Sequence, residues 1–155
     1  MLRYIAYEGL TSKTLKSFMQ MAIELKGSKM AIWKYCNGET ITSVAADNVP
    51  QALISQCLEE RQLLERVTIY NGEDLYSFQD TYVINEEAVN GIVASIVSIS
   101  QELDSISIYK ENEKEWFMSI IFHENMCIIK NIQKSEEAIL AKCGFTYSYS
   151  PPENW

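Results

Sequence analysis

The spacing of apolar residues predicts that the chain opens as strand, helix and strand. Residues 2–8 alternate in the manner of a strand, and residues 30–36 form a second apolar, strand-like run. Between them, apolar residues recur at the spacing of one helical face: Leu15, Phe18, Met19, Ala22 and Leu25. Thr11 or Ser12 is expected to cap the start of this helix, and Gly27 to follow its last turn.

An Asn-Gly pair occurs at positions 37–38 and again at positions 71–72. Both central residues of a type I′ turn need a positive φ, which Asn and Gly tolerate best, so each pair predicts a β-hairpin. The first hairpin is expected to return through residues 40–46. The second is expected to join a strand at residues 67–70 to one at residues 75–78.

A second helix is expected between the two hairpins. Asn48 is a favourable N-cap, and Pro50 is tolerated in a first helical turn. The apolar face of this helix would consist of Leu53, Ile54, Cys57, Leu58 and Leu64.

The chain continues with a strand at residues 81–84 and a helix capped by Asn85. Glu86 and Glu87 lie at the positive end of that helix, where acidic side chains are favourable. Its apolar positions are Val89, Ile92, Ile96, Ile99 and Leu103. Many of the side chains after position 91 are β-branched, which favours a strand. The sequence leaves helix and strand open for residues 86–102, and the length and the acidic first turn favour a helix.

The C-terminal third predicts mainly strands. Three of them are expected at residues 105–110, 116–123 and 126–131. Ser135 is expected to cap a short helix that ends at Gly144, and residues 145–150 to form a last strand. The whole pattern predicts an α+β protein in which about four helices cover one face of antiparallel sheet.

A weak internal repeat has a spacing of about 76 residues and makes Trp33 and Tyr109 equivalent. Residues 1–76 and 77–155 can each be written β-α-β-β-α-β, the order of ferredoxin-like domains. The sequence leaves open two tandem ferredoxin-like halves or one α+β sheet. Because no Pro/Gly/Ser-rich linker divides the chain, residues 1–155 are expected to form a single compact domain.

The charge of the chain is concentrated in its middle. The net charge of the 155 residues is −8, and residues 67–109 contain no Lys, Arg or His. The seven acidic residues of this stretch are Glu73, Asp74, Asp80, Glu86, Glu87, Glu102 and Asp104. A sequence pI near 4.7 argues against direct nucleic-acid binding, because phosphate contacts need a basic patch.

Acidic and aromatic residues alternate near the start of this stretch and predict a partner-binding surface. Glu73, Asp74 and Asp80 lie beside Tyr76 and Phe78. Exposed aromatic anchors beside charges that steer encounter are typical of interfaces. The surface would suit a basic protein partner, and the sequence therefore predicts a small cytoplasmic binding protein, such as a bacterial immunity protein or antitoxin that blocks a nuclease-type toxin. A solubilising surface is the simpler interpretation of the same charges.

Two other interpretations remain. A ligand-sensing or small-molecule-binding α+β domain would hold its ligand in an aromatic pocket between the two halves, lined by Trp33 and Tyr109. A homodimer could form through an exposed sheet edge.

Candidate catalytic residues are few, and the sequence predicts no enzyme, cofactor or metal site. His123 is the only histidine, and the four cysteines lie far apart, as expected for free buried thiols. Glu111, Glu113 and Glu115 lie in a polar run that predicts a solvated turn. No apolar run is long enough to span a bilayer, and the N-terminal residues lack a signal-peptide pattern, so membrane association is not expected.

Overall fold

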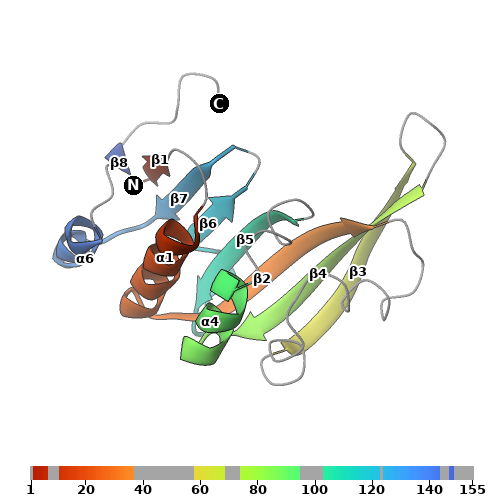
Figure 1. Ribbon diagram of the computed structural model, residues 1–155, viewed down its shortest axis with the longest axis horizontal. Helices are drawn as coiled ribbons and strands as arrows, with labels where there is room; N and C mark the ends of the chain where they lie inside the picture. The colour runs from red at the N-terminus through yellow and green to blue at the C-terminus, as the bar shows by residue number, and fades with distance from the viewer. Residues whose placement is uncertain are drawn as a thin grey trace.

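The computed structural model describes residues 2–6, 11–36, 58–68, 74–94, 103–122, 124–143 and 147–148. In these ranges the chain forms one antiparallel sheet, and the helices α1 and α4 pack side by side on one of its faces (Figure 1). The strands are β1 (Leu2–Ala6), β2 (Gly27–Cys36), β3 (Leu58–Thr68), β4 (Asp74–Val83), β5 (Leu103–Lys110), β6 (Met118–Ile121), β7 (Met126–Lys130) and β8 (Tyr147–Ser148). The helices are α1 (Ser12–Glu24), α4 (Glu86–Ala94) and α6 (Glu137–Lys142), with the 3₁₀ turn η1 (Lys134–Glu136) before α6. The α+β class is thus confirmed.

The strand order is β3-β4-β2-β5-β6-β7-β1-β8, and every neighbouring pair is antiparallel. Strands β4 and β5 therefore run in the same direction on either side of β2, and α4 connects them. This split β-α-β unit is a component of the ferredoxin-like fold. Strands β1 and β2 are also parallel and connected by α1, but β5, β6 and β7 lie between them. The described residues contain three α-helices, and neither a fourth helix nor a full β-α-β-β-α-β order is confirmed in them.

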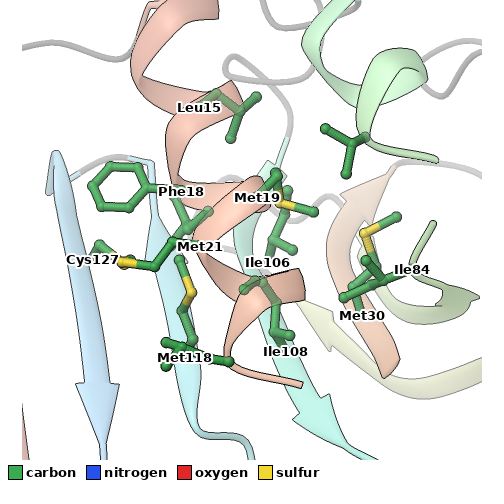
Figure 2. Packing of buried hydrophobic residues seen from close by; sticks show 14 of the residues in the cluster. Leu15, Phe18, Met19, Met21, Met30, Ile84, Ile106, Ile108, Met118 and Cys127 are labelled. Carbon is green, nitrogen blue, oxygen red and sulfur yellow. The ribbon is translucent and has the colours of Figure 1, made fainter. Parts of the chain in front are cut away.

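Helix α1 forms because its apolar residues make one stripe that the sheet can bury. Leu15, Phe18 and Met19 are fully buried and belong to the same central cluster as Ile106 and Ile108 of β5 (Figure 2). The other apolar side chains labelled in the figure are Met21, Met30, Ile84, Met118 and Cys127. Flexible methionine side chains fill irregular gaps, which suits a core assembled from three helices and several strands.

Thr11 caps α1, as the sequence predicts. The backbone N–H of Thr14 donates to Oγ1 of Thr11 at 3.2 Å, and the N–H of Thr11 donates to Oγ1 of Thr14 at 2.9 Å. These reciprocal bonds satisfy N–H groups that a helix start leaves without partners.

The expected role of Gly27 after α1 is wrong. The left-handed residue at this helix end is Lys26, with φ 69°, whereas Gly27 begins β2. Close packing explains the glycine instead. A Cβ added there would lie 2.8 Å from the carbonyl oxygen of Ala22 and 2.9 Å from Cγ2 of Ile108, so α1 and β5 leave no room for a side chain.

The expected second helix is wrong from Leu58 onward, because residues 58–68 form the strand β3. Its sequence is rich in Glu, Arg, Gln and Leu, which favour helices, but pairing with β4 overrides that preference. The pairing register shifts between Leu58 and Glu60 and between Leu63 and Glu65. Each shift adds one residue to β3 and breaks the alternation by which a strand is recognised.

The second hairpin is confirmed by the pairing of β3 with β4, in which Thr68 lies opposite Asp74. Its Asn-Gly turn lies outside the described residues, as do the Asn-Gly pair at positions 37–38, residues 40–46 and the capping position 48. The two strands expected at residues 75–78 and 81–84 form one continuous strand, β4.

Helix α4 is confirmed through Ala94. The backbone N–H of Ala88 donates to Oδ1 of Asn85 at 2.8 Å, which is the expected cap. Leu103 belongs to strand β5 and not to this helix. Strands β5, β6 and β7 are confirmed, and β8 matches part of the expected last strand. Ser135 lies inside η1, and Gln133 is the residue before that turn.

Lys26 and Gly27 provide a paired test of this helix end. We expect Lys26→Gly to raise the free energy of unfolding by about 0.5–1 kcal/mol, because glycine adopts the left-handed conformation without strain. We expect Gly27→Ala to lower it by about 1–3 kcal/mol, because the added methyl overpacks the core. Urea denaturation of both variants measures these changes. Equal destabilisation by both would contradict the geometry.

Candidate functional site

The predicted partner-binding residues lie along β4, and one of them is not at the surface. Asp80 is 5 % exposed, and the hydroxyl of Tyr82 donates to its Oδ2 at 3.2 Å. Tyr82 belongs to the core that α1 and α4 cover. The expectation that Asp80 is exposed is therefore wrong, because alternation along β4 places it in phase with the core residue two positions later.

Three of the other predicted residues are placed by their backbone in β4, and the fourth lies outside the described residues. Asp74, Tyr76 and Phe78 lie in β4, and Glu73 lies outside the described residues. Their role in partner binding stays a prediction. Strands β2, β3 and β4 extend past α1 and α4 (Figure 1), and the start of β4, where Asp74 lies, is the end away from the helices.

The strands beside β4 change the electrostatic picture. Arg61 of β3 lies opposite Asp80, and Lys34 of β2 lies opposite Phe78. A sequence window without basic residues is therefore flanked in space by strands that carry them. The described acidic positions of the stretch therefore differ in their surroundings. Glu86 and Glu87, at the start of α4, are exposed.

The residues of the expected aromatic pocket are four positions apart in the sheet. Trp33 of β2 pairs with Ser105, whereas Tyr109 of β5 pairs with Lys29. Four residues span about 13 Å along a strand, so the register does not bring these two positions next to each other. Tyr109 is half-buried, and burial raises the pKa of its phenol. The pocket stays a prediction.

A polar cleft of about 570 Å³ lies where the β5–β6 connection meets the end of β7. Its lining residues are Lys110, Asn112, Glu113, Lys114, Glu115, Trp116, Phe117, Asn131 and Gln133. Neither Trp33 nor Tyr109 is among them. Glu111, Glu113 and Glu115 are exposed in the turn, as the sequence predicts. Because this lining contains both lysines and glutamates, it does not strongly favour a ligand of either charge.

Three side chains of the cleft are already engaged. The ammonium of Lys130 lies 3.6 Å from the centroid of the Trp116 ring, and that of Lys110 lies 5.2 Å from the centroid of the Phe117 ring. Lys110 Nζ also forms an ion pair with Oε1 of Glu136 at 3.1 Å. These contacts fasten the β5–β6 connection to β7 and η1, which is a structural role.

Glu136 is the clearest titrating group of this region. Partial burial raises its pKa, but a hydrogen bond from the backbone N–H of Gln133, a hydrogen bond from Lys110 and the charge of Lys110 lower it more. The pKa of Glu136 is consequently below its ordinary value. The bond from Gln133 to Oε2 measures 2.9 Å.

A second cleft of about 540 Å³ lies over α1, α4 and α6. Its lining residues are Lys16, Gln20, Ile23, Glu24, Glu86, Val89, Asn90 and Lys142. Lys142 of α6 forms an ion pair with Glu24 of α1 at 3.3 Å, which joins the last helix to the first. Here too acids and lysines are mixed, and the cleft carries no arrangement of nucleophile and base.

The chemistry of the described residues is limited. In the described ranges no group of three or more His, Cys, Asp or Glu side chains could hold a metal ion, and His123 lies outside them. Cys127 and Cys143 are free thiols, and burial raises the pKa of both, that of Cys127 well above its ordinary value. A raised pKa leaves little reactive thiolate. No helix in the described part of the chain is long and apolar enough to cross a membrane.

Comparison with protein-family models, curated proteins and solved structures finds no match to this chain.

The burial of Asp80 has a direct test. We expect Asp80→Lys to lower the free energy of unfolding by about 3–5 kcal/mol, because it replaces a buried, hydrogen-bonded carboxylate with a cation. Glu111→Lys makes the same change of charge at an exposed turn and should alter stability by less than about 0.5 kcal/mol. Urea denaturation compares the two. Equal stability of both variants would mean that Asp80 is a surface residue.

Glu136 predicts a pH dependence of stability. Its folded-state pKa is lowered, so its contribution is fully present above the ordinary carboxyl pKa and is lost as the pH falls through the folded value. We expect Glu136→Gln to cost about 1 kcal/mol at neutral pH, and the difference from the unmodified protein to shrink in acid. Urea denaturation between pH 7 and pH 3 measures it, with Glu113→Gln as the exposed control. A difference that grows in acid would contradict this assignment.

Proposed function

We propose that the protein is a small, acidic, cytoplasmic binding protein that neutralises a basic protein partner. The most specific form of this proposal is a bacterial immunity protein or antitoxin that blocks the active site of a nuclease-type toxin. The observation that carries it is the charge distribution, because seven acidic and no basic side chains lie in residues 67–109 of a chain with net charge −8. A nuclease must be basic where it holds nucleic acid, and an acidic protein of this size is complementary to such a site.

The arrangement of the strands supports a binding role. The β3–β4 hairpin extends beyond the helices, and Asp74 lies near its turn (Figure 1). We propose that Glu73, Asp74, Tyr76 and Phe78 form the centre of the docking surface. The buried Asp80 is left out of it. Charges near the turn would accelerate encounter with a basic partner, and the aromatic residues would slow dissociation.

We further propose that the chain arose by duplication, with two related halves. Ala31 of β2 pairs with Ser107 of β5, and these residues are 76 positions apart, the spacing of the sequence repeat. A twofold axis through this pair would exchange β2 with β5 and α1 with α4, which pack against each other. The β6–β7 hairpin would then be an insertion in the second half.

The proposed function is tested by neutralisation of a toxin. We expect co-expression with a basic nuclease toxin encoded beside its gene to restore growth of the host cells. The purified protein should inhibit cleavage of DNA, and its association with the toxin should slow as salt rises, since screening acts over about 8 Å at physiological ionic strength.

Two variants with equal changes of charge locate the surface. Glu73→Lys with Asp74→Lys should slow association about tenfold, whereas Glu111→Lys with Glu113→Lys should have a much smaller effect. Stopped-flow fluorescence measures both rates. Absence of inhibition by the unmodified protein would refute the function, and equal effects of the two variants would refute the proposed surface.

A further inference from the structure

Strand β3 lies at one end of the sheet and pairs, among the described strands, only with β4. It is 11 residues long, whereas β8 at the other end of the sheet has 2. A long edge strand presents a row of backbone N–H and C=O groups to which another chain can add a strand.

The two register shifts in β3 separate four of its five charged positions by sign between the faces of the sheet, and the fifth, Glu59, has no partner in β4. The extra residues are Glu59 and Leu64, because Leu58 and Glu60 pair with successive residues of β4, as do Leu63 and Glu65. Without these shifts, simple alternation would place acidic and basic residues of β3 together on each face.

The observed register places the acidic positions on the face away from the helices. Glu60 and Glu65 lie opposite Thr81 and Ser77, which alternate with the helix-covered positions of β4. Between them, Gln62 lies at a position of the same phase.

The arginines take the other phase. Arg61 lies opposite Asp80 and Arg66 opposite Tyr76, so both positions are on the face that carries the buried Asp80 and Tyr82. By register, the positions of Glu60 and Glu65 and those of Arg61 and Arg66 therefore lie on opposite faces of the edge strand. A partner strand that adds to this edge presents its side chains alternately to the two faces of the sheet. Only those on the side away from the helices lie beside the acidic positions.

Symmetric antiparallel pairing of β3 with a second copy of itself is unfavourable. In a symmetric antiparallel pairing centred on Gln62, Glu60 of one copy would lie directly opposite Glu65 of the other. In a pairing centred on Leu63, Arg61 would lie directly opposite Arg66. A pairing about Arg61 or Glu65 would oppose that residue to its own copy. Like charges directly opposite each other destabilise a strand pair, so the central alignments are all unfavourable.

We propose that the edge of β3 binds an extended segment of a basic protein partner as an added β-strand. The lysines or arginines of that segment lie at alternating positions and contact Glu60 and Glu65 on the face away from the helices. This proposal rests on the proposed function and adds a second contact, along the edge of β3, to the docking surface proposed around Asp74, Tyr76 and Phe78 of β4. Backbone hydrogen bonds along the edge hold the segment, and its basic residues select it over other extended chains.

The first test uses the unmodified protein and a synthetic peptide that alternates lysine with threonine and valine. Two control peptides accompany it: one has glutamate in place of lysine, and one keeps the lysines but carries N-methyl groups on alternate backbone nitrogens. We expect the first peptide alone to bind and to protect β3 amides from hydrogen exchange. Binding of the N-methylated peptide with equal affinity, or protection confined to other strands, would overturn the proposal.

The second test compares charge variants of the protein. Glu60→Lys with Glu65→Lys should weaken binding of the lysine peptide at least tenfold, and Glu111→Lys with Glu113→Lys should change it less than threefold. Circular dichroism confirms that each variant is folded, and the peptide controls decide the proposal if the β3 variant is not. Equal losses in both variants would show that only net charge matters, which would overturn the edge assignment.

The toxin assay separates this inference from the proposed function. If the unmodified protein neutralises the toxin and the folded variant with Glu60→Lys and Glu65→Lys does so equally well, the edge assignment fails and the function stands. If the unmodified protein does not neutralise it, the function fails, and the peptide experiment still decides whether β3 accepts a basic strand.

Discussion

The burial of the apolar stripe of α1 against the central strands is the constraint on which the other features depend. Leu15, Phe18 and Met19 are fully buried, so the helix must lie close to β2 and β5. That proximity requires a residue without a side chain at Gly27, where a Cβ would meet both α1 and β5. The chain therefore leaves the helix one residue earlier, through Lys26 in a left-handed conformation. A packing requirement has displaced the usual preference for glycine at the helix end.

Local patterns predicted those elements whose own residues determine them. The cap at Thr11, the amphipathic α1, the acidic start of α4 and the pairing of β3 with β4 follow from neighbouring residues. Residues 58–68 look helical because two bulges shift the period of their apolar positions, and only the pairing with β4 reveals them as a strand. The sheet order was not predictable either, because β1 and β2 are separated by three strands that come later in the chain.

The sequence proposes residues for the candidate site but does not predict their geometry. The sequence shows which charged residues follow one another along the chain. A sheet, in contrast, places side by side residues that are far apart in the sequence. Asp80 illustrates the difference, because its position opposite Arg61 and in phase with Tyr82 assigns it to the covered face. A signal was present in the sequence, since Asp80 and Tyr82 are two positions apart in a strand and therefore share a face. The sequence alone does not say which face is covered.

The bulges of β3 connect the fold to the proposed binding mode. Edge strands in proteins often carry bulges and charged residues that prevent uncontrolled pairing. In β3 the two extra residues also set the register that places Glu60 and Glu65 on one face and Arg61 and Arg66 on the other. In the proposed binding mode, protection against self-association and selection of a basic partner arise from the same two inserted residues. Specificity of this kind needs repulsion from the wrong partner as well as attraction to the right one, and a single bulged edge supplies both.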